Sequence, residues 1–207
     1  MPYLSVSPII DYDHEAIGEL CLGLVRGGTE KEFLSAAFHY ARDGIRFEFR
    51  SFGQTVSETL KAGAGHCYHK SNLFVALCRR KGIQAGLRYC ELKAEALAPY
   101  WSEEARRLFG QGPIGHFYAA AYIEGQWRSF DPIFDMELLR YADRLDWKVA
   151  DRWDGSSEMT LPQDLIVSGR DGVLASAFPE DGIPPSDAGM LDMMNERLRA
   201  IRLGLAE

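Results

Sequence analysis

Three side chains that lie far apart in the chain have the types needed for nucleophilic attack on a carbonyl group. Cys67 begins a strong helical pattern, and the unpaired N–H groups and positive dipole at such a helix end favour a thiolate. His116 opens a predicted strand, and Asp131 ends the strand that follows it. A thiol nucleophile needs a proton carrier, most often histidine, and a carboxylate can orient the imidazole. Cys67, His116 and Asp131 are therefore the candidate catalytic residues.

A predicted hairpin tests whether His116 and Asp131 can meet. If the chain turns at Glu124-Gly125, residue 118 lies opposite residue 131. His116 and Asp131 are then diagonal neighbours on one face of the sheet, about 7–8 Å apart at the backbone and within side-chain reach. An ordinary structural role stays open for each residue: Cys67 as a small core cysteine, and Asp131 as the start of a turn before Pro132.

The remaining histidines fit the role of base less well. His69 lies two residues along the helix of Cys67 and so points about 200° away from it. His66 is adjacent to Cys67, and sequence neighbours rarely align for proton transfer. Surface positions are expected for His14 and His39, and core positions for Cys21, Cys78 and Cys90. Lys70 either helps to lower the thiol pKa or is a solvated charge or ion-pair partner.

The elements that must position these groups follow from apolar periodicity and capping signals. Thr29 with Glu32, and Thr55 with Glu58, have the capping-box spacing and predict two helix starts. The helix that begins at Cys67 carries an apolar stripe and ends in Arg79-Arg80-Lys81-Gly82, where cations suit the helix dipole. Helices are predicted over 13–26, 29–44, 55–63, 67–81 and 133–153, and strands over 45–49, 83–92, 116–123 and 127–130. This order indicates an α+β fold.

Two segments lie outside that core pattern. Residues 94–115 form a predicted insertion with a short helix at 103–109, in which Trp101 and Phe109 form either a lid over a cleft or a surface loop. A linker around 181–189 precedes a last amphipathic helix, which packs on its own domain by default or on a second copy of the chain. We expect one domain over 1–180, with a core at 45–135, followed by the linker and helix of 181–207.

Composition excludes several classes of protein. The 207 residues carry 30 acidic and 23 basic side chains, a net charge of −7, and no Lys/Arg cluster, so nucleic acid is not an expected partner. No apolar run approaches the roughly 20 residues of a membrane span, and the first residues lack the pattern of a signal peptide. A cytoplasmic location is expected. The four cysteines are unclustered, which favours neither a disulfide framework nor a zinc site, and no metal or cofactor is predicted.

The motifs around the three candidate residues resemble those of the transglutaminase-like superfamily, in its bacterial type. Gly65-His66-Cys67, followed by a helix ending in Leu77-Cys78-Arg79 and then Gly82-Ile83, is similar to its nucleophile segment. Gly115-His116-Phe117 and Phe130-Asp131-Pro132 resemble its His strand and Asp-Pro strand. The resemblance covers about residues 45–135, and implies a papain-like cysteine fold with a nucleophile helix on an antiparallel sheet and Cys67, His116 and Asp131 as the triad. Gln54 is a weak candidate for the oxyanion donor.

The sequence predicts a cysteine-dependent enzyme that forms a thioester on Cys67 and cleaves an amide or ester bond in a peptide, a protein or another amide-containing substrate. Hydrolysis is favoured over transfer to an amine because no dedicated amine site is apparent. Two alternatives stay open. One is a binding module that keeps the fold without turnover, and the other is an acyltransferase that uses a small thioester such as acetyl-CoA.

Overall fold

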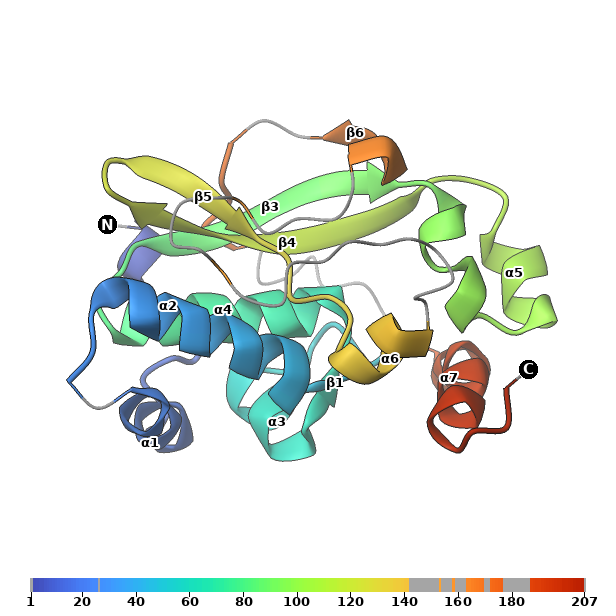
Figure 1. Ribbon diagram of the computed structural model, residues 1–207, viewed down its shortest axis with the longest axis horizontal. Helices are drawn as coiled ribbons and strands as arrows, with labels where there is room; N and C mark the ends of the chain where they lie inside the picture. The colour runs from blue at the N-terminus through green and yellow to red at the C-terminus, as the bar shows by residue number, and fades with distance from the viewer. Residues whose placement is uncertain are drawn as a thin grey trace.

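A curved antiparallel sheet covers a layer of helices, and one helix runs between the two (Figure 1). The computed structural model describes residues 2–25, 27–141, 153, 158, 163–169, 172–176 and 187–206. The predicted linker at 181–186 and the predicted helix beyond residue 141 lie outside these residues. Short 3₁₀ turns at Pro2–Leu4 and Gln163–Leu165 belong to neither layer. The α+β class predicted from the element order is confirmed.

The first helices begin where their capping residues predict. Helix α1 spans Glu15–Leu24, α2 spans Glu30–His39 and α3 spans Val56–Ala62. Both capping boxes form: the Thr29 and Thr55 side chains accept from the backbone N–H three residues on, and Glu32 and Glu58 accept from the cap N–H groups. Helix α2 continues into a π-helical turn at Tyr40–Gly44. The capping signals therefore fixed the starts of α2 and α3 from local sequence alone.

Helix α4 (Cys67–Arg80) is the centre of the fold. It packs against the sheet on one side and against α1, α2 and α3 on the other. Every residue from Tyr68 to Arg79 is buried, so the predicted apolar stripe was too narrow a description of its environment. A helix enclosed in this way cannot shift along its axis without opening the core on both sides.

Two basic side chains of α4, Lys70 and Arg79, are buried, and neither expectation for Lys70, a solvated charge or a group that lowers the thiol pKa, included this burial. The Lys70 ammonium group donates to the carbonyl oxygens of Arg42 and Ile45, at 2.7 and 2.8 Å. Arg79 donates to the carbonyls of Ser5, Ala85 and Ala175. Both side chains therefore satisfy buried backbone carbonyls. Sequence periodicity could not reveal this because the carbonyls come from distant segments.

The sheet has the strand order β5-β4-β3-β6, with all neighbours antiparallel. Its strands are β3 (Ala85–Leu92), β4 (Ile114–Ile123), β5 (Gln126–Phe130) and β6 (Ile166–Gly169). The turn between β4 and β5 lies at Glu124-Gly125, where both φ angles are positive, 51° and 84°, as a two-residue type I′ hairpin requires. Ala119 pairs with Phe130, which confirms the predicted hairpin register.

The insertion after β3 packs against the rest of the domain and contributes side chains to a second core cluster. Two 3₁₀ turns, at Ala94–Ala96 and Ala98–Tyr100, precede helix α5 (Glu103–Phe109). Tyr100 and Trp101 are buried in a second core cluster together with Phe134 and Leu138. For Trp101, neither of the two alternatives, a lid or a surface loop, is right, because its indole belongs to the core.

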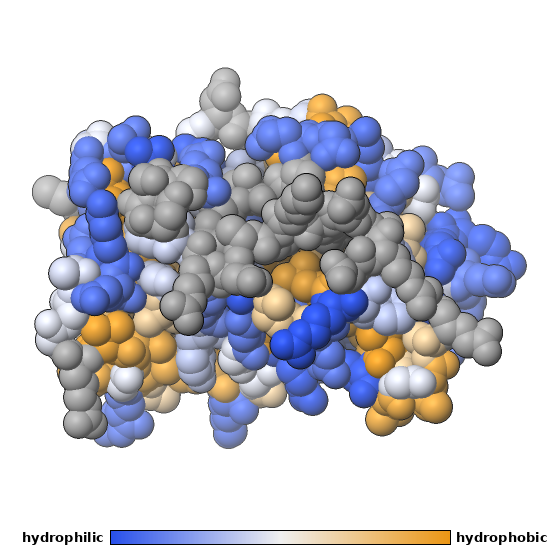
Figure 2. Space-filling model, viewed as in Figure 1, coloured by the Kyte–Doolittle hydropathy of each residue, from blue (hydrophilic) through white to orange (hydrophobic). Residues whose placement is uncertain are grey.

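The C-terminal helix packs on the same domain, which is the default that the sequence suggested. Helix α7 (Ala188–Arg202) buries Leu198 and Ile201 in the second cluster, beside the short helix α6 (Met136–Tyr141). Apolar atoms show on the surface near the C-terminal end of α7 (Figure 2), where Leu203 and Leu205 are exposed. Within the described part of the chain, no helix has the length and apolarity to cross a bilayer.

The buried Lys70 gives the fold a testable pH dependence. Burial disfavours the charged amine and lowers the pKa of Lys70 to about 7, whereas the unfolded chain keeps the ordinary value near 10.5. Between these values the unfolded state binds more protons, so this group makes the free energy of unfolding rise with pH from about 7 to 10, by at most about 1.4 kcal/mol per unit. The neutral amine retains two N–H groups for the two carbonyls.

We expect Lys70→Met to lose this rise. Urea unfolding at pH 7 and pH 9.5 should show the parent protein gaining stability relative to the variant at the higher pH. Lys61→Met, which removes an exposed lysine of α3, should leave the difference between the two pH values unchanged. An equal stability difference between parent and Lys70→Met at both pH values would contradict the assignment.

Candidate active site

Cys67 is held at the first residue of α4 by a short pair of strands. Strand β1 (Arg46–Phe47) pairs in parallel with β2 (Ala64–Gly65), and Phe47 lies opposite Gly65, two residues before the cysteine. The strand predicted over 45–49 is thus only two residues long. His66, the N-cap residue, makes no side-chain cap bond, and the first turn has no acidic residue. The positive end of α4 is therefore not neutralised by its own side chains.

Solvent access separates Cys67 from the other cysteines. Cys67 is partly exposed, whereas Cys21, Cys78 and Cys90 are buried, and all four are free thiols. Burial raises the pKa of each of the three buried thiols. These three cysteines belong to the core, as predicted.

His116 and Asp131 meet as the hairpin register predicts. His116 Nε2 donates to Asp131 Oδ2 at 2.8 Å, and both side chains are buried. His116 lies in β4 and pairs across the sheet with Cys90, while Asp131 directly follows β5. With Nε2 occupied, Nδ1 is the ring nitrogen left for a second partner, and the Cys67 side chain is near enough to the ring to contribute to the raised pKa of His116.

The environment of His116 favours its charged form. Burial alone would lower the pKa, but the charge and hydrogen bond of Asp131, together with Cys67, outweigh it and raise the pKa of His116 to about 10. An imidazolium beside a thiol stabilises the thiolate. The imidazole of His116 and the carboxylate of Asp131 are therefore hydrogen-bonded, and the sulfur of Cys67 is close enough to affect the pKa of the imidazole.

A second histidine, His66, lies against the sulfur, a contact that the sequence analysis did not predict. His66 Nδ1 is 3.8 Å from Cys67 Sγ, and His66 Nε2 donates to the Arg50 carbonyl at 3.2 Å. Burial and the neighbouring His69 and His116 lower its pKa well below the usual value, so His66 is neutral and presents a lone pair to the sulfur. Sequence reasoning missed this contact because it depends on the extended backbone of His66 before the helix.

The other candidates have structural partners. His69 points away from Cys67, as predicted, and its Nε2 donates to the Ser51 carbonyl at 2.8 Å. Gln54 is not an oxyanion donor, because its amide donates to the Thr59 hydroxyl at 3.0 Å and it lies outside the cavity of Cys67. Its role is to tie the loop before α3 to that helix.

Cys67, His66 and His116 line one cavity of about 380 Å³. The remaining lining comes from β1 and the segment after it, from the insertion and the ends of β3 and β4 that flank it, from the segment after β5 and from α7. It comprises Phe47, Phe49, Arg50, Phe52, Leu92, Leu97, Phe109, Ile114, Gly115, Phe117, Ile133, Met190, Leu191 and Met194. The partly exposed sulfur thus faces a largely apolar space. In the described part of the chain, no three His, Cys, Asp or Glu side chains cluster in a way that could hold a metal ion.

A comparison with protein-family models matches the part of the chain that contains α4, β4 and β5. The model of the Transglutaminase-like superfamily matches residues 23–132, more than half of the 207 residues. The chain therefore belongs to the transglutaminase-like superfamily, and its central helix on an antiparallel sheet is the papain-like fold of that superfamily. Cys67, His116 and Asp131 all lie inside the match, whereas α6 and α7 lie beyond it.

Two further comparisons, with solved structures and with curated proteins, give less information about the protein than the family model does. The chain is similar to the crystal structure of a protein described as a putative cysteine protease, from Cytophaga hutchinsonii, with a TM-score of 0.48 and 23% sequence identity. The similarity covers 63% of this chain and 40% of that one, so the chain spans less than half the length of this neighbour. No curated protein matches the sequence.

The charged state of His116 depends on Asp131, and a substitution tests this. In Asp131→Asn the carboxylate charge is lost while an amide oxygen of similar size remains, so burial should dominate and the pKa of His116 should fall from about 10 by more than one unit. NMR titration of the imidazole resonances measures this value directly. Asp13→Asn, at an exposed position, should leave the titration unchanged. A His116 pKa that is the same in the parent and in Asp131→Asn would contradict the pairing.

Proposed function

We propose that the protein is a cysteine-dependent acyl-transfer enzyme that cleaves an amide or ester bond through a thioester on Cys67. The observation that carries the proposal is the position of His116, which binds Asp131 through one ring nitrogen and has Cys67 at the ring as its other polar partner. Family membership supports a cysteine-dependent enzyme in general. The roles of the three residues and the type of reaction are our proposal.

In this mechanism the Cys67 thiolate attacks the substrate carbonyl carbon, and a C–S bond forms. The negative charge that develops on the carbonyl oxygen is stabilised by the positive end of α4, whose first turn has no acidic residue. His116 then gives its proton to the leaving amine or alkoxide as the C–N or C–O bond breaks. Asp131 keeps the imidazole oriented throughout and stabilises its charged form before and after each proton transfer.

Water completes the cycle in the reaction that we favour. His116, now neutral, accepts a proton from water as the water oxygen attacks the thioester, and the C–S bond breaks to release a carboxylic acid and the thiol. An amine acceptor would need a group that binds its ammonium form. The cavity lining contains no carboxylate among the described residues, which supports hydrolysis over transfer to an amine.

His66 does not take the role of acid in this scheme. Its low pKa keeps it neutral, and its Nε2 proton is held by the Arg50 carbonyl. The raised pKa of His116 makes it the proton donor to the leaving group. At neutral pH, His116 is therefore positively charged and His66 is neutral.

The first test is the reactivity of Cys67 towards iodoacetamide. Because an adjacent imidazolium stabilises a thiolate, we expect Cys67 to be alkylated readily at pH 6, where an ordinary thiol with a pKa of about 8.5 reacts slowly. Peptide mass mapping should find Cys21, Cys78 and Cys90 unmodified under the same conditions, because they are buried. His116→Ala should lose the reactivity at pH 6 and regain it only at alkaline pH. If Cys67 needs the same pH as free glutathione, the ion pair does not exist.

The second test is turnover of p-nitrophenyl esters. We expect an acyl adduct on Cys67 by intact-protein mass spectrometry, and a loss of kcat/KM of about a thousandfold or more in Cys67→Ala and in His116→Ala. Adding methylamine separates the two outcomes of the thioester, since hydrolysis gives the acid and transfer gives the methylamide. A folded protein that forms no adduct with any ester would favour the binding module. Amide as the main product at millimolar amine would favour the transferase.

A further inference from the structure

The cavity at Cys67 is walled in part by segments that do not carry the reactive groups. Leu97, Phe109 and Ile114 come from the insertion, and Met190, Leu191 and Met194 come from the first turns of α7. Strand β1 adds Phe47, and the segment after it adds Phe49 and Phe52. The nucleophile and its histidines therefore form one part of the lining, and apolar side chains from distant segments form the rest.

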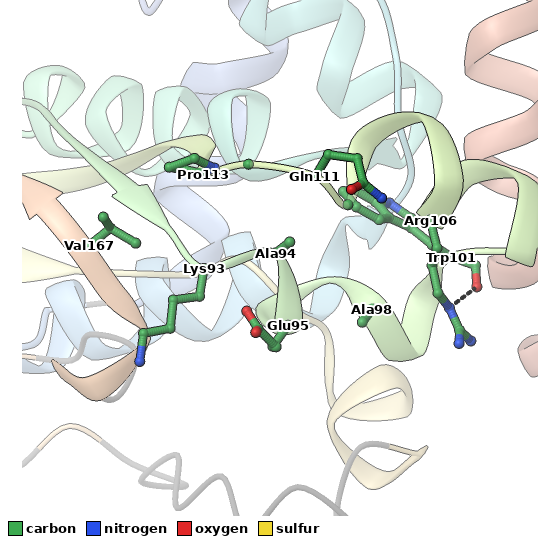
Figure 3. Close-up of a pocket in the computed structure, with 11 residues that line it drawn as sticks. Lys93, Ala94, Glu95, Ala98, Trp101, Arg106, Gln111, Pro113 and Val167 are labelled. Carbon is green, nitrogen blue, oxygen red and sulfur yellow. Dashed lines mark hydrogen bonds between the residues drawn. The ribbon is translucent and has the colours of Figure 1, made fainter.

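The insertion is a thin partition with a cavity on each side. Leu92, Leu97, Phe109 and Ile114 line the cavity of Cys67. Their immediate neighbours in sequence, Lys93, Ala98, Gly110 and Pro113, line a second cavity of about 400 Å³, which shares no residue with the first. Figure 3 shows this second cavity, where Lys93, Glu95, Gln111 and Arg106 bring polar groups, and Arg106 donates to the Trp101 carbonyl at 3.2 Å. The partition thus turns its apolar side towards the nucleophile.

Helix α7 is anchored firmly enough to serve as a wall. The Asn195 side chain accepts from Phe49 N at 2.8 Å and donates to Phe49 O at 2.9 Å, as a neighbouring strand would. At the other end of the helix Arg202 pairs with buried Asp135 at 2.6 Å and with Glu137. Met194 is the residue next to this Asn195 anchor, so its backbone position is fixed relative to Phe49.

The lining chemistry favours an apolar occupant. Among the described lining residues the only charged or titratable side chains besides Cys67 are Arg50, His66 and His116. Arg50 is paired with Glu48 at 3.2 Å, and both histidines hold partners already named. An apolar substituent gains about 25 cal/mol for each Å² that it buries. A charged substituent would lose its hydration against a mostly apolar lining, in which Arg50 Nε is a buried polar atom without a hydrogen-bond partner. The volume lies in the range of small-molecule sites.

We propose that this cavity binds the acyl group of the substrate, and that the enzyme selects a bulky apolar group, aromatic or branched aliphatic, attached to the carbonyl that Cys67 attacks. This inference rests on the proposed function. Met194, from α7, and Phe109, from the insertion, set the size of the group that fits. Small acyl groups leave the cavity unfilled and forgo the binding energy, so they react more slowly for the same leaving group.

The experiment compares p-nitrophenyl acetate with p-nitrophenyl phenylacetate, which have the same leaving group. In each case Cys67 attacks the ester carbonyl, the C–S bond forms, p-nitrophenolate leaves, and water then releases acetic or phenylacetic acid. We expect kcat/KM, corrected for the uncatalysed rates of the two esters, to be at least about tenfold higher for the phenylacetyl ester. The ratio of the two kcat/KM values is the measured selectivity.

Variants of the wall test its role. Met194→Trp fills the cavity and should lower the phenylacetyl-to-acetyl ratio at least about tenfold, whereas Phe109→Ala enlarges the cavity and should shift the preference towards larger groups such as naphthylacetyl. Glu196→Trp places the same indole on an exposed position of the same helix and should leave both rates unchanged. If Met194→Trp fails to fold, the parent ratio and Phe109→Ala still decide the question.

The outcomes separate this inference from the function on which it rests. If both esters acylate Cys67 with equal corrected kcat/KM, the acyl pocket is wrong and the enzyme proposal stands. If neither ester acylates Cys67 in folded protein, the proposed function itself fails. Protection of Cys67 from iodoacetamide by phenylacetamide, but not by acetamide, would support the pocket without any turnover, and equal protection by the two would overturn it.

Discussion

Helix α4 is covered by β3 and β4 on one side and by α1, α2 and α3 on the other, and this packing sets the position of its first residue. Burial extends from Tyr68 to Arg79, including a lysine and an arginine whose charged ends meet backbone carbonyls. Moving the helix by one turn, about 5.4 Å, would uncover its apolar side chains and break these hydrogen bonds together. The sulfur of Cys67 is therefore placed by the core of the protein, while its partly exposed side chain faces a cavity.

The same core also holds the wall opposite the nucleophile. Phe47 pairs with Gly65 just before Cys67, and its N–H donates to Asp135 at 2.7 Å. Asp135 in turn binds Arg202 at the end of α7, and the hydrogen bonds to Asp135 and its nearby positive charges lower its pKa although burial alone would raise it. Because Asp135 is charged and almost fully buried, removing Arg202 would leave it poorly compensated, which is costly in a low-dielectric interior. The nucleophile and the C-terminal helix thus share one anchor, even though they lie more than a hundred residues apart.

Local sequence signals predicted much of the fold, but they did not predict the contacts between segments that are distant in the sequence. The capping boxes at Thr29 and Thr55 and the turn at Glu124-Gly125 specify their geometry within four residues, and the turn alone sets the register that brings His116 to Asp131. The burial of Lys70, the packing of Trp101 in the core and the pairing of Asn195 with Phe49 each depend on groups supplied from elsewhere in the chain. The position of His66 beside the sulfur depends on a single extended residue, a detail finer than helical periodicity resolves.

The family match includes the three candidate residues, but not all of the side chains that line the cavity. The family match ends at residue 132, so it includes Cys67, His116 and Asp131 but not Met190, Leu191 or Met194. A substitution in α7 can change the shape of the cavity while leaving the packing of α4 and the hairpin register untouched, because the helix contacts the core through its buried face at Leu198 and Ile201. The match therefore includes the insertion and its part of the cavity wall, whereas the part that α7 contributes lies outside the region that the family similarity describes.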